Sequence, residues 1–185
     1  MRFQRFMSSM KLPSFSKLDL SSVDTLSDSP IPFETVFVND EDFSDVRHID
    51  LSNTKFWSGN AGKGTFTVNI EKYIKLKDLN ISSSIVTSIS LPNTSLSSLN
   101  ITNSTVEGIS LVNQPFLKSL DFSACRRLKT VTIDSCDKIT ELNLSNLGDL
   151  HTIKITSCPN LKSIVCTNNG NLTTFNAVSY THLRA

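Results

Sequence analysis

Residues 117–147 read LKSLDFSACRRLKTVTIDSCDKITELNLSNL, and this stretch decides the fold. It divides into three similar units, LKSLDFSAC from Leu117, LKTVTIDSC from Leu128 and ITELNLSNL from Ile139. Apolar side chains occupy the first, fourth and sixth positions of each unit. Because side chains alternate between the two faces of an extended segment, the fourth and sixth point to one side and the fifth points to the other.

The same pattern continues on both sides of this stretch. Units of 10 or 11 residues follow one another over residues 76–176 and begin at Leu76, Val86, Leu96, Val106, Leu117, Leu128, Ile139, Leu150, Leu161 and Leu172. A further unit, VRHIDLSNT from Val46, is separated from this array by an irregular stretch. Repetition at a fixed short period is typical of a solenoid, in which each unit buries its apolar face against its neighbours.

The pattern resembles the leucine-rich-repeat family, whose motif is L-x-x-L-x-L-x-x-N/C. It is similar to the bacterial subclass with nested half-repeats (IRREKO), in which both halves of a coil carry L-x-x-L-x-L. The resemblance covers about residues 76–176 and the unit at 46–54. The sequence departs from the family at the ninth position, which is filled by Ser84, Thr94, Ser104, Gln114, Cys125, Cys136, Leu147, Cys158 and Asn169.

Two units make one coil of about 22 residues, so we expect a β-rich solenoid with short parallel strands. Alternate units then form two narrow sheets joined by tight polar corners. The predicted core consists of the apolar first, fourth and sixth positions, namely Leu76, Leu79, Ile81, Leu96, Leu99, Ile101, Leu117, Leu120, Phe122, Leu128, Val131, Ile133, Ile139, Leu142, Leu144, Leu150, Ile153 and Ile155.

One outer face is the candidate binding surface, with Lys77, Asn80, Asn100, Lys118, Asp121, Glu141 and Asn143. Its fifth positions form a column of amide and carboxylate side chains. The favoured interpretation is structural, with stacked amides bonding to one another, and the alternative is a polar stripe that faces a ligand. Neither outer face has the exposed aromatic anchors that dominate tight interfaces. Binding is therefore expected to be polar and broad.

The residues that carry chemistry form no catalytic or metal-binding pattern. Cys125, Cys136 and Cys158 fall on the ninth position and Cys166 on the sixth, so repeat register predicts free buried thiols. The loop SGNAGKGT at residues 58–65 lacks the first glycine of the Walker pattern and is interpreted as a turn. His48, His151 and His182 have no nucleophile placed with them, although His48 lies beside Asp50. The sequence predicts no enzyme, no metal and no cofactor.

The composition of the chain narrows the classes of partner and the compartments that can be expected. The net charge is +1, which gives no case for nucleic acid or an anionic membrane. No stretch has the length of a membrane span, and the N-terminus has no apolar run typical of a secretory signal. Cytoplasm or a virion is therefore favoured over secretion. N-x-S/T sequons, which a repeat rich in Asn, Ser and Thr produces by composition, begin at Asn80, Asn93, Asn100, Asn103, Asn143 and Asn171.

The chain is predicted to have four parts. Residues 1–45 are an irregular capping segment, with a linker at 17–32 and a basic amphipathic helix near the N-terminus as the alternative to a cap. Residues 46–75 hold the outlying unit and the Gly-rich insertion, and residues 76–176 form the solenoid. Residues 177–185, AVSYTHLRA, resemble a translated sequencing adapter, so a truncated reading frame and a non-native tail are expected.

Three functions fit these observations. The leading expectation is a non-enzymatic leucine-rich-repeat scaffold that binds a protein or a glycan. The alternatives are a structural or tail component of a bacteriophage virion and a fragment of a larger surface protein. Repeat arrays with an open end also associate end to end, so self-association is a further expectation.

Overall fold

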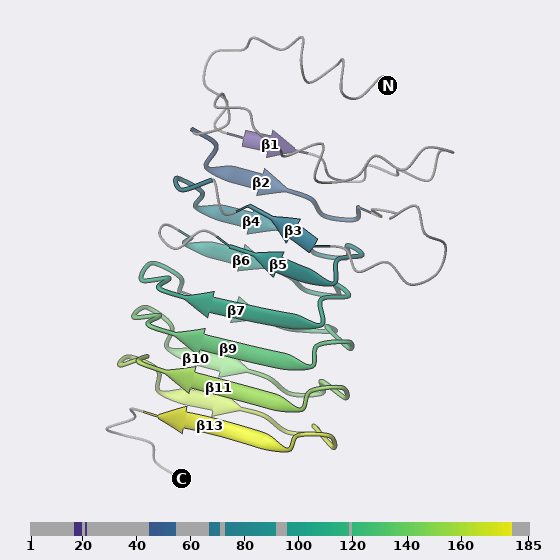
Figure 1. The fold of residues 1–185 in the computed structure, drawn as a ribbon, viewed down its shortest axis with the longest axis vertical. Helices are drawn as coiled ribbons and strands as arrows, with labels where there is room; N and C mark the ends of the chain where they lie inside the picture. The colour runs from purple at the N-terminus through teal and green to yellow at the C-terminus, as the bar shows by residue number, and fades with distance from the viewer. Residues whose placement is uncertain are drawn as a thin grey trace.

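The protein is a parallel β-solenoid. The computed structural model describes residues 17–19, 21, 45–54, 67–70, 73–91, 96–118 and 120–178, and within them thirteen strands and no helix. The chain winds from one end of the molecule to the other, so that each coil lies against the next (Figure 1). The expected fold class, a β-rich solenoid of short parallel strands, is confirmed.

Strands from alternate units assemble into two sheets. One sheet has seven described strands, in the order β1 (Lys17–Asp19), β2 (His48–Asp50), β4 (Asp78–Asn80), β6 (Ser98–Asn100), β8 (Leu120–Asp121), β10 (Glu141–Asn143) and β12 (Ser163–Val165). The other has six, in the order β3 (Thr67–Asn69), β5 (Ser88–Ser90), β7 (Gly108–Val112), β9 (Thr130–Asp134), β11 (Thr152–Thr156) and β13 (Thr174–Val178).

The register aligns equivalent positions of successive coils. Thr130 pairs with Thr152 and Thr152 with Thr174, and all of the described strand pairs are parallel. A coil therefore advances by 22 residues here, the separation of Asp134 from its neighbour Thr156. Parallel strands lie about 4.8 Å apart, so each position of the repeat forms a straight column along the solenoid.

The array begins earlier than the sequence indicated. The unit at 46–54 is not an outlier, because His48 pairs with Asp78 and Ile49 with Leu79 in the register of the main array. Lys17–Asp19, placed in the expected linker, forms β1 and pairs with β2. At the other end, Ala177 and Val178 belong to β13 rather than to a tail. Residues 58–65, the N-terminal 16 residues and residues 179–185 lie outside the described part of the chain.

The space between the sheets is filled by the predicted core. All of the residues named for it are buried, and the tightest large side chains include Phe122, Leu79 and Leu96. Val46, Ile49 and Leu51 of the second coil join the same cluster, as do Ile70 and Tyr73. One continuous core therefore runs through the stacked coils, which explains why no single unit has to be stable alone.

The corners of the coils share one backbone feature. Wherever the structure describes the eighth residue of a unit from Val46 to Leu161, that residue is left-handed, with φ between 51° and 61°. The set comprises Asn53, Ser83, Asn103, Asn113, Ala124, Ser135, Asn146, Ser157 and Asn168. Asn tolerates this conformation better than most residues. The frequent Asn and Ser in the sequence therefore mark the places where the chain turns from one sheet to the other.

Candidate functional site

The predicted binding residues lie together on the outer face of the seven-stranded sheet. Lys77, Lys118, Asp121, Glu141 and Asn143 are exposed, and Asn80 and Asn100 are partly exposed. The strands that carry them have two or three residues each, so this face is narrow. The residues selected from the sequence thus lie on one surface. Their side chains differ in how many hydrogen-bonding groups remain available to a partner.

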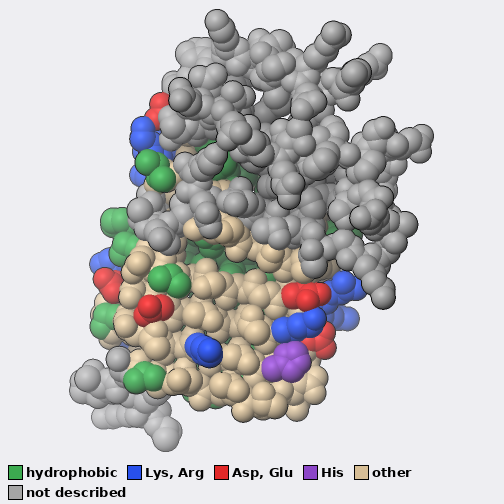
Figure 2. Space-filling view, viewed as in Figure 1, with side chains coloured by type: hydrophobic (Ala, Val, Ile, Leu, Met, Phe, Trp, Pro, Cys, Tyr) green, Lys and Arg blue, Asp and Glu red, His purple; other side chains and the backbone are tan. Residues whose placement is uncertain are grey.

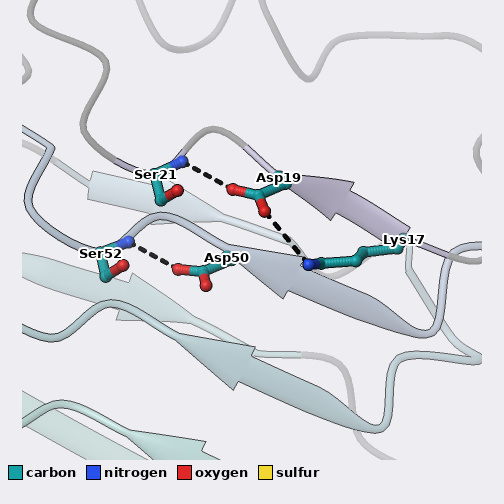
Figure 3. A network of polar contacts seen from close by, with 5 residues as sticks. All are labelled: Lys17, Asp19, Ser21, Asp50 and Ser52. Carbon is teal, nitrogen blue, oxygen red and sulfur yellow. Dashed lines mark hydrogen bonds and ion pairs between the residues drawn. The ribbon is translucent and has the colours of Figure 1, made fainter.

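The column of amides and carboxylates on this face closes the turns. The Oδ1 atoms of its members accept hydrogen bonds from the backbone N–H two residues later, at 2.8–3.2 Å, for Asp19, Asp50, Asn80, Asn100, Asp121 and Asn143. Figure 3 shows the first two of these bonds, from Ser21 to Asp19 and from Ser52 to Asp50. These are Asx-turns. The bonds that the favoured interpretation expected between stacked amides are not the ones described, because the Oδ1 atoms of the column bond to the backbone of their own turns.

Basic and acidic side chains pair at the first coils on the same side of the molecule, once within β1 and twice between neighbouring coils. Lys17 Nζ lies 3.1 Å from Asp19 Oδ2, and His48 Nδ1 lies 2.6 Å from Asp78 Oδ2, so His48 pairs with the next strand rather than with neighbouring Asp50. Lys75 also pairs with Asp45. Hydrogen bonds from Ser21, together with Lys17, lower the pKa of Asp19 to about 2. These pairs are half exposed and contribute little to stability individually.

The six-stranded sheet offers a wider outer face. Its strands β7, β9, β11 and β13 have five residues each. In register on this face lie the hydroxyls of Thr130, Thr152 and Thr174, and beside them Thr132, Lys154 and Asn176. Figure 2 shows this side of the molecule, where uncharged polar groups and backbone predominate and charged side chains are scattered.

Two contacts tie neighbouring strands of this face together. Lys129 Nζ lies 2.7 Å from Glu107 Oε2, and the Thr156 hydroxyl donates to Asp134 Oδ1 at 2.6 Å. The bond from Thr156 lowers the pKa of Asp134. Sequence alone did not single out this face, because its residues are mixed in type. The recurrence of its polar residues at a spacing of 22 residues is the sequence signal that identifies the face.

Inside the solenoid, the ninth positions satisfy buried backbone groups. The Thr54 hydroxyl donates to the carbonyl of Leu51 at 2.6 Å, and Ser84 bonds in the same way to Ile81. Asn169 reaches the preceding coil, where its Nδ2 donates to the Leu144 carbonyl at 2.6 Å and its Oδ1 accepts from the Leu147 N–H at 2.9 Å. In these units the ninth side chain supplies the donor that a corner carbonyl needs, whereas Leu147 occupies the same position without a polar group.

The four cysteines are free thiols, of which Cys125, Cys136 and Cys158 are buried and Cys166 is partly buried. Burial raises the pKa of Cys125. Cys136 Sγ donates to the carbonyl of Asp134 at 3.5 Å, and Cys158 Sγ donates to the carbonyl of Thr156 at 3.1 Å. The interaction of the two neighbouring thiols raises the pKa of Cys136 and lowers that of Cys158. The prediction of free buried thiols holds for three of them. Cys166 is more accessible because it lies in the last full coil.

The described residues contain no group of three or more His, Cys, Asp or Glu side chains placed to hold a metal ion. In the same part of the chain, no helix has the length and apolar character needed to cross a membrane. Comparisons of the sequence with protein-family models and curated proteins, and of the fold with solved structures, give no match. The geometry of the two faces and of the interior columns is therefore the basis for a functional proposal.

Proposed function

We propose that this protein is a non-enzymatic scaffold that binds a protein or a glycan through the outer face of its six-stranded sheet. The observation that carries the proposal is the register of this sheet, which sets Thr130, Thr152 and Thr174 in one row and Thr132, Lys154 and Asn176 in the next. These rows present hydrogen-bond donors and acceptors at the spacing of neighbouring strands. Such rows can bind an extended partner whose own polar groups repeat at a similar spacing.

The contrast between the two faces supports this choice. On the seven-stranded sheet, the fifth-position oxygens are already engaged with the backbone of their own turns. On the six-stranded sheet, the fifth positions of the long strands carry Thr132 and Lys154, which project from a strand rather than close a turn. A partner on this face therefore competes less with bonds that hold the fold.

A glycan array and a protein array, probed with the full chain, test the proposal. The test variant carries Thr132→Glu and Thr152→Glu on the six-stranded sheet, and the matched control, with the same change of charge, carries Ser98→Glu and Thr140→Glu on the other face. Because all four positions point outward, both variants should fold. We expect a ligand that binds the wild type and the control but binds the test variant at least about tenfold more weakly, a difference of about 1.4 kcal/mol. Equal binding by both variants, or silence on both arrays, would refute the proposal.

A specific observation favours a second candidate, assembly through the last coil. Val165, Phe175 and Val178 are 46%, 48% and 52% exposed, and all three belong to β12 or β13, the last strands of their sheets in the described chain. Exposed apolar groups beside strand edges promote association. This supports a structural role, such as that of a virion component, or a place within a longer array.

Light scattering across a range of concentrations tests this second candidate. The wild type should form dimers or larger species as the concentration rises, whereas Phe175→Asp should remain monomeric at the same concentrations. A wild type that stays monomeric throughout would remove the assembly role without affecting the binding proposal.

A further inference from the structure

A row of mostly basic side chains runs along one margin of the seven-stranded sheet, at the corner where β7, β9 and β11 end (Figure 1). Its members are the second residues of successive units in that sheet, and we call them the basic row: Arg47, Lys77, Ser97, Lys118, Thr140 and Lys162. Backbone hydrogen bonds join neighbouring members. The N–H of Lys77 donates to the Arg47 carbonyl at 2.8 Å, and that of Lys162 donates to the Thr140 carbonyl at 2.8 Å.

The positive charges of the basic row are exposed and unpaired. Its four cationic side chains lie on the surface, and none of them forms an ion pair with any residue that the structure describes. The second positions of the six-stranded sheet differ, because they carry both signs of charge and Lys129 is already paired with Glu107 at 2.7 Å. The charge of the basic row is therefore left for a partner.

The stacking of the coils sets the spacing of these charges. Successive coils lie about 4.8 Å apart, so the five steps of the basic row span about 24 Å. Lys77, Lys118 and Lys162 are separated from one another by two coils, about 9.6 Å. The hydroxyl side chains of Ser97 and Thr140 lie between them. A ligand that follows the basic row thus meets cations and hydroxyl groups in alternation.

An exposed aromatic ring lies beside the centre of the basic row. Phe116 is 56% exposed, although the sheet continues with a strand on each side of its coil. It precedes Lys118 by two residues, and exposed Lys138 holds the same repeat position in the next coil. An aromatic face with cations around it suits the apolar C–H face of a sugar ring that carries a carboxylate.

Two carboxylates near the basic row restrict which anions can bind. Asp137 precedes Lys138, and Glu141 follows Thr140. Both acidic residues are exposed, and neither pairs with a described basic residue. They repel a polyanion of high charge density, such as duplex DNA with one charge per about 1.7 Å of its axis. A chain with widely spaced acidic groups can place them at the lysines and its neutral groups beside the carboxylates.

We infer that the basic row and Phe116 bind a linear acidic polysaccharide with one carboxylate on every second sugar. Two sugars of an extended chain have a length close to the two-coil separation of the lysines, so carboxylates can lie at Lys77, Lys118 and Lys162 at the same time. The sugar next to Lys118 packs on Phe116. This surface is separate from the outer face of the six-stranded sheet, so the inference does not depend on the function proposed above.

Isothermal titration calorimetry of the full chain at physiological salt tests the site, with short hyaluronate chains, whose carboxylates lie on alternate sugars, as the probe. The test variant carries Lys77→Ser and Lys118→Ser. The control carries Arg126→Ser and Lys154→Ser, which remove two exposed cations away from the basic row. The test variant should bind about tenfold more weakly, because each exposed charge pair contributes a few-fold to affinity. The control should bind as the wild type does, since charges beyond about 8 Å are largely screened.

The aromatic ring and a second probe distinguish a sugar from other anions. Phe116→Ser should weaken the binding of hyaluronate about fivefold, whereas Phe116→Tyr, which keeps the ring, should bind as the wild type does. Polyglutamate, an acidic peptide with a denser charge, should bind more weakly than hyaluronate at equal carboxylate concentration. Its binding should not change in Phe116→Ser.

The lysine-to-serine variants are expected to fold, because Ser97 already occupies the basic row, and circular dichroism verifies this. The inference is overturned if the wild type does not bind hyaluronate, or if the test variant binds it no more weakly than the control. It is also overturned if Phe116→Ser leaves the affinity unchanged. Polyglutamate that binds as tightly as hyaluronate would assign the basic row to an acidic protein instead.

Discussion

The middle of the solenoid and its last coil carry the same repeat in different environments. Val131, Ile153 and Phe175 lie in one column, paired in register on neighbouring strands, and each is the fourth residue of its repeat unit. The first two are completely buried, whereas nearly half of Phe175 is exposed. The repeat sequence thus decides which way a side chain points, but a neighbouring coil on each side decides whether it is buried. Stability in such an array depends on nearest neighbours.

The largest expected difference between the two regions comes from replacing a phenylalanine by alanine in each. Phe122, at the sixth position of a central coil, is fully buried. We expect Phe122→Ala to lower the free energy of unfolding by about 3–5 kcal/mol, the usual cost of emptying a large core position. Phe175→Ala should cost less than about 1 kcal/mol, because half-exposed apolar area contributes less. Urea unfolding followed by circular dichroism measures both, and equal costs would break the comparison.

A smaller effect is expected from the amides at the last corner. Asn169 bridges two coils through the Leu144 carbonyl and the Leu147 N–H, whereas exposed Asn171 reaches only the Gly148 carbonyl, at 2.6 Å. Asn169→Ala should therefore destabilise the protein by about 1–3 kcal/mol, because it leaves enclosed polar groups without partners. Asn171→Ala, where water replaces the bond, should cost at most about 0.5 kcal/mol. A larger loss for Asn171 in thermal unfolding would contradict this.

Substitutions at the left-handed corner residues should change the free energy of unfolding by similar amounts throughout the array, because the conformational strain at these residues is local to the backbone. Ala124, with φ of 59°, is the one such residue in the described coils that is neither Asn nor Ser. Ala124→Gly should raise stability by about 1 kcal/mol, and Asn53→Ala, near the other end, should lower it by a similar amount. Chemical denaturation of both variants tests this, and a dependence on position in the array would show that the corners are coupled to their neighbours.

The smallest predicted effect is a dependence on acid. The pKa values of Asp19, Asp45 and Asp134 are lowered in the folded protein, so these groups stabilise it above their ordinary pKa and lose that contribution as the pH falls. The melting temperature should therefore decline between about pH 4 and pH 2. The decline should be shallower in Asp134→Asn, which removes the group, and in Thr156→Val, which removes the largest cause of its lowered pKa. An unchanged slope in both variants would contradict this assignment.

The periodicity of apolar residues was enough to predict the two sheets and the core, because alternation in a strand leaves only one way to bury the fourth and sixth positions. It did not reveal β1, and it did not assign the strand at residues 67–69, β3, to the array. Leu18 and Leu20 repeat the L-x-L pattern, but Lys17 lies 31 residues before its partner His48, which hides the period. The coil that contains β3 has Thr65 where other units begin with Leu, Ile or Val.

The turns held a second signal in the sequence. Asp or Asn at the fifth position is followed two residues later by Ser or Thr in each of the units whose Asx-turns close the corner. At the sequons that begin at Asn80, Asn100 and Asn143, the same Asn side chain closes an Asx-turn. The pairing of outer residues across coils was harder to predict, because it depends on the register of the whole array.

The rate at which the four thiols react with iodoacetamide in the native protein tests the account most directly. Each cysteine lies at a defined position of the repeat. The four thiols differ chiefly in whether a following coil covers the coil that carries them. We predict that Cys166 is labelled first, while Cys125, Cys136 and Cys158 react more slowly, through opening of the array. Rapid labelling of all four at the same rate, followed by peptide mass spectrometry, would show that the central coils are not closed and would contradict the solenoid described here.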